Sequence, residues 1–231
     1  MKYLKYLFVV FISIHLNTLK SQNKNLKDEN PEISQIAIIL FDDYETLDVF
    51  GPAEIFGRLT DRYQLTFYSQ KGGIVSNRHG VPIMTTKLDE LKKTPAITFI
   101  PGGLGTRIEV NNESLINHIK HLSLESDYVL SVCTGSALLA KTGLLDGRNA
   151  TSNKRAFSWV TSQGVNVNWD HKARWAIDGK YYTSSGVSAG MDMAFGFLAD
   201  RHGVDFARKV AWEIEYNWIE DKNFDKFTAK E

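Results

Sequence analysis

The stretch YVLSVCTGSALLA, residues 128–140, contains Cys133, which is the only cysteine among the 231 residues of the chain. Its first five residues are mostly β-branched, aromatic or apolar, a pattern typical of a short buried strand. Small residues follow the cysteine and lead into good helix formers. The stretch therefore predicts a sharp turn from a strand into a helix, with Cys133 at the turn.

The predicted turn places the Cys133 sulfur over the N-terminus of a helix. The helix dipole and the free N–H groups at that end favour a thiolate, so we expect Cys133 to have a lowered pKa and to act as a nucleophile. The alternative is a buried cysteine that serves as a small apolar side chain, which is common for free cysteines. The small residues after Cys133 favour the reactive thiol.

Strands and helices alternate along the chain on both sides of this turn. Apolar runs at Ile36–Phe41 and Ala96–Ile100 predict buried parallel strands. The dipeptide Asp178-Gly179 predicts a hairpin between strands at 173–177 and 181–184. Helices are expected over residues 48–59, 113–124, 155–163, 188–201 and 204–219. This alternation predicts an α/β fold in which helices cover both faces of a parallel sheet.

Composition and the chain ends define the expected domain organisation. Lys plus Arg and Asp plus Glu both number 27, and no basic patch indicates nucleic-acid binding. A basic start and a short apolar run predict a signal peptide over residues 1–21, with an uncleaved anchor as the alternative. A polar tether over 22–34, a single domain over 35–222 and a C-terminal tail over 223–231 follow. We therefore expect an exported protein, periplasmic or secreted, with no stable membrane span.

Three predicted strand ends carry the residues of a candidate site, since ligands of open α/β sheets bind at the carboxyl ends of the strands. Asp48 follows the first strand, Gly102 and Gly103 follow another, and Cys133 and Thr134 follow the third. Asp48 could hydrogen-bond the thiolate or transfer a proton, or it could cap a helix. The N–H groups of Thr134 and of one glycine could bind developing negative charge, unless the glycines form an ordinary turn.

Two further observations concern ligands of the site. Ser185 and Gly186 lie in a run of small residues after the predicted hairpin, and we expect them to line the pocket wall rather than to bind phosphate. His118 and His121 have a spacing that could suit a metal, but no third ligand accompanies them. We therefore predict no metal site and no cofactor.

Four motifs in order resemble the ThiJ/PfpI superfamily, which has the class I glutamine amidotransferase-like fold. They are LDVFGP at 47–52, IPGG at 100–103, SVCTGS at 131–136 and GLLDGRNAT at 143–151. Within that superfamily the set is most similar to the isocyanide hydratase branch. The resemblance implies a flavodoxin-like sandwich, a nucleophile elbow at Cys133, Asp48 as the carboxyl partner of the sulfur, and a homodimer.

Two positions depart from the patterns of these relatives. Thr134 stands where amidotransferase and peptidase relatives carry a histidine, which argues against a Cys-His pair and against a peptidase. Asn153 stands where several isocyanide-hydratase-like proteins carry a histidine. Asn153 therefore belongs to the expected pocket, and the pocket differs enough that the exact substrate does not follow from the resemblance.

We therefore predict a cofactor-free enzyme in which Cys133 attacks a small electrophile, Asp48 moves a proton and water releases the product. The resemblance implies hydration of an isocyanide to an N-formamide, or related lyase or hydrolase chemistry. The alternatives are a non-catalytic thiol sensor and a small-ligand-binding member of the superfamily. Some relatives carry such a module before a DNA-binding domain. About a dozen residues follow Ile219, too few for a helix-turn-helix, so we expect no nucleic-acid partner.

Overall fold

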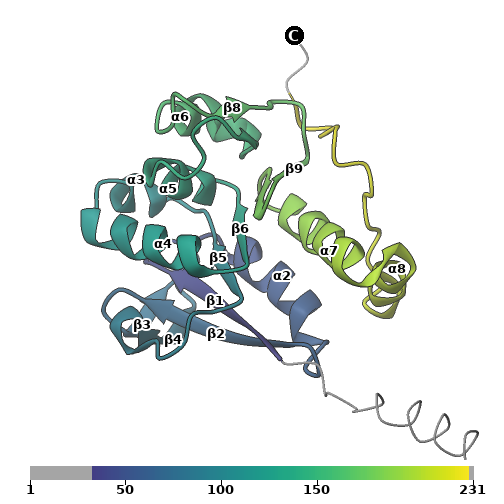
Figure 1. The fold of residues 1–231 in the computed structure, drawn as a ribbon, viewed down its shortest axis with the longest axis horizontal. Coiled ribbons are helices and arrows are strands. Elements are labelled where there is room, and N and C mark those ends of the chain that lie inside the picture. Colours follow the sequence, from purple (N-terminus) through teal and green to yellow (C-terminus); the bar gives the residue numbers. More distant parts are fainter. Residues whose placement is uncertain (1–32, 229–231) are drawn as a thin grey trace, which may run out of the picture. The chain divides into compact units, whose positions relative to one another are not determined.

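An eight-stranded sheet organises residues 33–228, the part of the chain that the computed structural model describes (Figure 1). The strand order is β3-β4-β2-β1-β5-β6-β10-β9. Neighbouring strands run parallel throughout, except that the edge strands β3 and β9 are antiparallel to their neighbours. The strands are β1 (Ser34–Leu40), β2 (Tyr63–Ser69), β3 (Gly73–Ser76), β4 (Pro82–Lys87), β5 (Ile97–Ile100), β6 (Tyr128–Val132), β9 (Trp175–Asp178) and β10 (Tyr181–Ser184).

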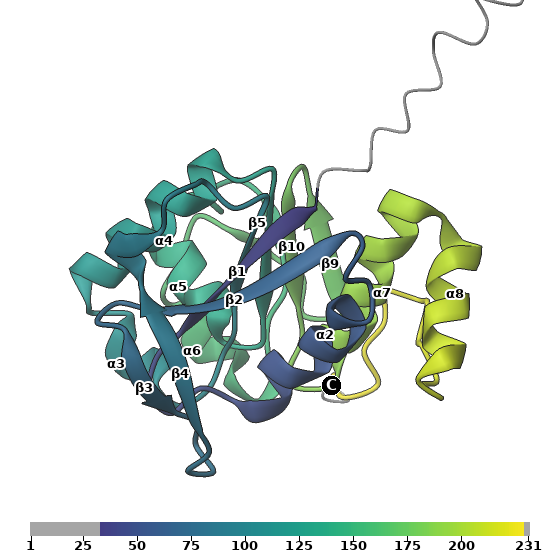
Figure 2. The same cartoon turned by 90° about the horizontal axis from the view of Figure 1, so that it is seen from below.

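Helices cover both faces of this sheet, with α2, α7 and α8 on one side and α3, α4 and α5 on the other (Figures 1 and 2). The helices are α2 (Thr46–Gly57), α3 (Thr106–Glu109), α4 (Glu113–Glu125), α5 (Gly135–Lys141), α6 (Phe157–Thr161), α7 (Ala189–His202) and α8 (Val204–Glu213). Two-residue strands β7 (Asn149–Ala150) and β8 (Asn168–Trp169) form a second small sheet. Residues 36–40 are at most 2% exposed, because both faces of β1 are covered.

The predicted α/β sandwich with a nucleophile elbow is confirmed, and the hairpin forms between β9 and β10. Two helix predictions are wrong in extent. The helix expected over 155–163 is a 3₁₀ turn at Lys154–Ala156 followed by the short α6. The helix expected over 204–219 ends at Glu213, and Glu215 just after it adopts the left-handed conformation with φ 53°.

The chain after α8 continues without helix or strand over residues 216–228, with turns at 222–223 and 226–227, and we call this segment the C-terminal arm. Its Ile219 N–H donates a hydrogen bond to Asp192 Oδ1 on α7 at 2.9 Å, and the Tyr216 hydroxyl donates to the same atom at 3.2 Å. Asp225, in the region predicted to be a tail, is fully buried. The arm therefore packs onto the rest of the described unit.

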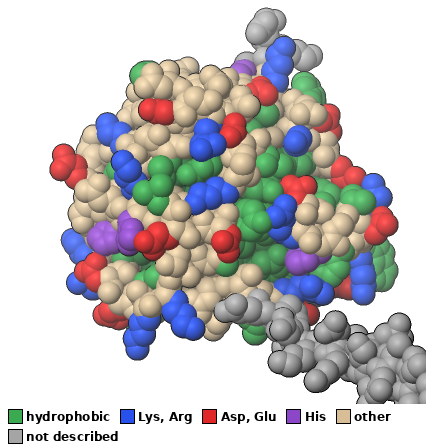
Figure 3. Space-filling model, viewed as in Figure 1, with side chains coloured by type: hydrophobic (Ala, Val, Ile, Leu, Met, Phe, Trp, Pro, Cys, Tyr) green, Lys and Arg blue, Asp and Glu red, His purple; other side chains and the backbone are tan. Residues whose placement is uncertain are grey.

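The predicted signal peptide over residues 1–21 and the periplasmic assignment drawn from it are not supported, and we withdraw both. That segment and residues 22–32 of the predicted tether lie outside the described residues, whereas Ser34, the last residue of the predicted tether, is the first residue of β1. Within residues 33–228, no helix is long and apolar enough to cross a membrane. Figure 3 shows acidic and basic side chains interspersed over one face of the molecule.

Candidate active site

Cys133 lies between the end of β6 and the start of α5, in a left-handed backbone conformation with φ 57°. Non-glycine residues adopt this region at a cost of about 1–3 kcal/mol, and they do so mainly at functional sites. The Cys133 N–H donates to the carbonyls of Ser184 at 3.1 Å and Ser185 at 3.3 Å, which holds the strained turn in place. Parallel pairing of Val132 with Ser184 brings that loop to the elbow.

Two glycines allow the three strand ends to pack together around this turn. A Cβ on Gly102 would lie 2.6 Å from the backbone nitrogen of Thr134 and 2.9 Å from Asp48 Oδ2. A Cβ on Gly135 would overlap the carbonyl oxygen of Ile100. These close approaches explain why the motifs at 100–103 and 131–136 carry glycine at these positions.

Asp48 lies in the first turn of α2 and is fully buried. Its Oδ2 accepts the Gly102 N–H at 3.0 Å. Its Oδ1 is buried and has no hydrogen-bond partner among the described residues, and the carboxyl group interacts with the neighbouring Cys133 thiol. Glu45, not Asp48, occupies the N-cap position of α2, so the alternative role of Asp48 as a helix cap does not apply. Asp48 and Cys133 therefore face each other inside the protein.

Polar groups from two further segments surround the Cys133 sulfur. The backbone N–H and hydroxyl of Thr134 and the side-chain amide of Asn153 lie beside it and would stabilise a thiolate there. Gly186 packs directly above, because a Cβ there would lie 3.0 Å from Sγ and would overlap the Asn153 amide. Ser185 contributes its carbonyl rather than its side chain. The structure thus brings the predicted pocket residues to Cys133, and their functional roles stay predictions.

The N–H groups of the glycine loop are engaged inside the protein. Gly102 donates to Asp48, as described, and Gly103 donates to Thr134 Oγ1 at 3.0 Å. A developing negative charge would have to displace one of these bonds to use either donor. The predicted contribution of this loop to charge stabilisation therefore stays a prediction, whereas its role in orienting Asp48 and Thr134 follows from the contacts.

The expected lowered pKa of Cys133 is contradicted. Burial raises the pKa of the Cys133 thiol well above its usual value, and the neighbouring Asp48 charge raises it further. Hydrogen bonds from Thr134 and Asn153 act in the opposite direction but do not offset burial. Burial likewise raises the pKa of Asp48 well above its usual range. Cys133 and Asp48 are both buried, and a negative charge on either one disfavours ionisation of the other. Their two protons therefore titrate as a coupled pair.

We predict that the alkylation rate of Cys133 rises with pH in two steps, because the pair loses two coupled protons. The upper step should lie well above the range of a free thiol, since a second buried negative charge is unfavourable beside the first. In Asp48→Asn a single step should remain. Iodoacetamide trapping followed by mass spectrometry measures both profiles on the one cysteine. A single wild-type step that Asp48→Asn does not move would show that the two groups are uncoupled.

Some residues of the site were not found in the sequence. The Thr106 hydroxyl lies 3.0 Å from Thr134 Oγ1, and Ser152 Oγ donates to the Cys133 carbonyl at 2.8 Å. Their small polar side chains give no distinctive local signal. Lys154 follows Asn153, and burial lowers its pKa to about 8, but its Nζ is engaged by Thr151 Oγ1 and by the Ala173 carbonyl.

An α/β sandwich with a buried cysteine at a nucleophile elbow and a carboxyl group facing its sulfur defines the class of this protein. The model of the DJ-1/PfpI family matches residues 34–200, and the chain belongs to this family. The predicted ThiJ/PfpI membership is therefore confirmed.

The relatives of the chain differ in their described roles. It is 30% identical to an isonitrile hydratase of Pseudomonas putida, over 79% of this chain and 78% of that protein. It is 26% identical to the HTH-type transcriptional regulator GlxA of Rhizobium meliloti, over 64% of this chain and 46% of the regulator. A ThiJ/PfpI family protein from Pseudomonas syringae has a similar fold, with a TM-score of 0.71 at 24% identity over 87% and 82% of the two chains. Membership alone thus leaves the activity open.

We predict that Gly186→Ala slows both the thiolate reaction of Cys133 and any turnover. The new methyl group would occupy the place of the Asn153 amide, so that the sulfur would lose a hydrogen bond of about 1 kcal/mol and a corresponding factor of about five in thiolate population. Gly57→Ala is the matched control, because a Cβ there has no neighbour closer than 4.0 Å. Equal alkylation rates in the two variants would contradict the assigned contact.

Proposed function

We propose that this protein is a cysteine-dependent, cofactor-free hydratase of small electrophiles, with an isocyanide as the substrate class. The observation that carries the proposal is the fully buried Asp48 carboxyl group, which lies beside the Cys133 thiol and whose Oδ1 has no hydrogen-bond partner among the described residues. A carboxylate in this position can take the thiol proton and return it to the substrate. A buried thiol becomes a nucleophile only when a neighbouring group accepts its proton, and Asp48 is that group in this proposal.

The proposed reaction begins with transfer of the Cys133 proton to Asp48. The thiolate attacks the terminal carbon of R–N≡C, a C–S bond forms, and the carbon takes the proton from Asp48 to give a thioimidate, R–N=CH–S–Cys. Water then adds to this carbon while Asp48 accepts its proton. Asp48 passes this proton to the nitrogen, the C–S bond breaks, the hydroxyl proton of the adduct returns to the sulfur by way of Asp48, and R–NH–CHO leaves with the thiol restored. The net reaction adds one water to the isocyanide.

The similarity to the isonitrile hydratase of Pseudomonas putida supports this choice of substrate, because it extends over most of both chains. The burial of Cys133, which is 6% exposed, favours a compact electrophile over a protein substrate. Asn153 and Thr134 would hold the sulfur while it carries charge. A small-molecule partner and a homodimer are further parts of the proposal.

The proposal is tested by turnover on a panel of alkyl and aryl isocyanides, α-oxoaldehydes and amides, with N-formamide detected by mass spectrometry. Water labelled with ¹⁸O should place one label in the formyl group. The proposal requires formamide formation that needs Cys133. Turnover of α-oxoaldehydes alone would overturn the isocyanide assignment, and absence of turnover on the whole panel would overturn the enzyme assignment.

A thiol sensor or ligand-binding protein is the second candidate, and the similarity to transcriptional regulators favours it. In that case an electrophile or oxidant would modify Cys133 without release of product. Intact-mass analysis after exposure to each panel compound separates the two candidates. A stable stoichiometric adduct without product supports the sensor, whereas an enzyme returns to its unmodified mass.

A further inference from the structure

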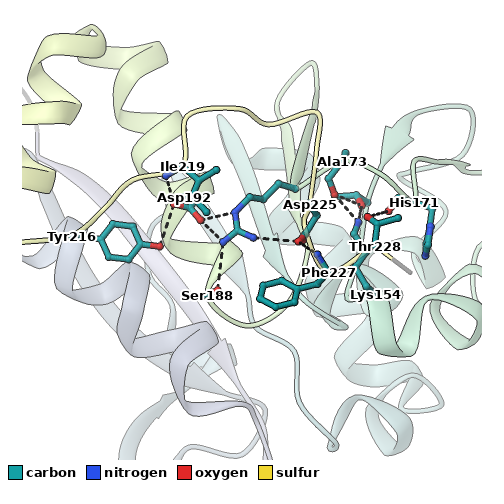
Figure 4. Close-up of polar contacts among 12 residues, drawn as sticks. Lys154, His171, Ala173, Ser188, Asp192, Tyr216, Ile219, Asp225, Phe227 and Thr228 are labelled. Atoms are coloured by element: carbon teal, nitrogen blue, oxygen red, sulfur yellow. Dashed lines mark hydrogen bonds and ion pairs between the residues drawn. The ribbon is translucent and has the colours of Figure 1, made fainter. Parts of the chain in front are cut away.

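Arg174 is a charged residue that the proposed mechanism does not use, yet its side chain is 2% exposed. It directly precedes the edge strand β9. Its Nε donates to Asp192 Oδ2 at 2.7 Å, and its Nη1 donates to Asp225 Oδ1 at 3.4 Å. Figure 4 shows the two aspartates on opposite sides of the guanidinium group that they contact. Buried ions of this kind persist only when partners hold them from several directions.

The two carboxylates that hold Arg174 come from different parts of the fold. Asp192 belongs to α7, whereas Asp225 belongs to the C-terminal arm. Backbone contacts reinforce this junction, since the Arg174 N–H donates to the Lys222 carbonyl at 2.7 Å and the Asp225 N–H donates to the Lys172 carbonyl at 2.7 Å. The arm therefore covers the free edge at the start of β9 and is fixed there by a buried charge.

Arg174 also contacts both ends of the loop that covers the sulfur. Its carbonyl accepts the Ser185 N–H at 2.8 Å, and its Nη2 donates to Ser188 Oγ at 3.4 Å. Between these two contacts, the Ser185 carbonyl accepts the Cys133 N–H and Gly186 packs on Sγ. A continuous series of contacts thus leads from Asp225 through Arg174 and this loop to Cys133.

We propose that Arg174, held by Asp192 and Asp225, is a positioning residue for Cys133, and that the C-terminal arm is therefore a working part of the active site. Release of the arm would loosen the Ser185–Ser188 loop, so that the sulfur becomes more accessible while its hydrogen bonds become less well ordered. The proposal rests on the proposed function for its effect on turnover, but its effect on the thiol can be measured without any substrate.

Asp225→Asn tests this proposal with little change in shape. The asparagine can still accept the Phe227 N–H that Asp225 Oδ1 accepts at 3.0 Å, and Arg174 keeps Asp192 as its counter-ion. We expect alkylation of Cys133 by a bulky maleimide to accelerate about tenfold, which corresponds to about 1.4 kcal/mol in a local opening equilibrium. The acceleration of alkylation by iodoacetamide should be smaller, because this smaller reagent needs less opening of the loop to reach the sulfur. Turnover of the isocyanide should fall several-fold.

Glu220→Gln is the matched control, because Glu220 is also a carboxylate of the C-terminal arm paired with an arginine. Its partner Arg208 is 54% exposed at the side chain, and the two hydrogen bonds recorded for the Glu220 carboxylate both come from Arg208. We expect wild-type alkylation and turnover in this variant. A rise in both variants would indicate general loosening of the arm and would overturn the specific role of Arg174.

Low urea concentrations separate local opening from a loss of global stability. Alkylation through a local movement of the loop should be nearly independent of urea, whereas alkylation through global unfolding rises steeply. Unchanged alkylation in folded Asp225→Asn, or an acceleration that appears only with a strong urea dependence, would overturn the proposal.

Should Asp225→Asn fail to fold, Ser188→Ala serves as a second variant, because it removes one contact to the loop without changing a charge. We expect this variant to accelerate alkylation of Cys133 as well, by a smaller factor. If the wild type shows no turnover, the proposed function fails while the alkylation comparison still decides this inference.

Discussion

Cys133→Ser is expected to lower turnover by roughly 10⁴-fold or more while the protein stays folded. The hydroxyl of serine has nearly the size of the thiol, but it ionises far less readily, and the buried position of residue 133 makes an alkoxide still less accessible. The carbonyls of Ser184 and Ser185 would still accept the N–H of residue 133, so the elbow should persist. The rate of formamide release from an isocyanide tests the loss of turnover, and thermal unfolding of the variant tests whether it stays folded.

Ser136→Ala serves as the control for this substitution. Ser136 Oγ donates to the Cys133 carbonyl at 3.0 Å, so this variant perturbs the same turn without touching the sulfur. We expect it to change turnover by less than tenfold, in keeping with the loss of one neutral hydrogen bond of about 1 kcal/mol. Retained turnover in Cys133→Ser would exclude the thiolate mechanism, whatever the substrate.

Asp48→Asn is expected to lower turnover by about 10²- to 10⁴-fold, the usual contribution of a general acid or base. Asparagine keeps the size of the side chain and an oxygen that can accept the Gly102 N–H, so thermal unfolding should change little. Its amide can no longer take the thiol proton or return one to the substrate carbon. The substitution therefore separates proton transfer from packing.

Glu54→Gln is the matched control for Asp48→Asn, because it also removes a carboxylate of α2. Glu54 is exposed and pairs with Arg58 at 2.9 Å, away from the sulfur. We expect its turnover to equal that of the wild type, since exposed ion pairs contribute little. Normal turnover in Asp48→Asn would assign Asp48 a structural role and leave the proposed mechanism without its base.

Much of the fold could be predicted from local patterns, because buried parallel strands and strand-to-helix turns have local signatures. The apolar run that forms β1 and the small residues after Cys133 are such signatures. The C-terminal end of α8 has no local sequence signature, because the contact that ends the helix involves a residue far away in the sequence. The chain leaves the helix to pack on Asp192 of α7, which lies 27 residues before Ile219.

The same distinction applies to the candidate site. The motifs placed Asp48, Thr134 and Asn153 around Cys133, and the structure brings these residues together. The pKa prediction was wrong because it weighed the end of one helix and not the burial of the whole site. Arg174 was missed because an isolated arginine in a mixed sequence does not reveal that two distant aspartates enclose it.

The left-handed backbone of Cys133 sets stability against activity at this position. Glycine would adopt φ 57° without strain, and its introduction would relieve a backbone cost of order 1 kcal/mol. Selection for heat resistance alone would therefore favour replacement of Cys133, whereas selection for function must retain Cys133 in its strained backbone conformation. Thermostabilisation of this protein should accordingly be sought elsewhere, at positions that do not contact the elbow.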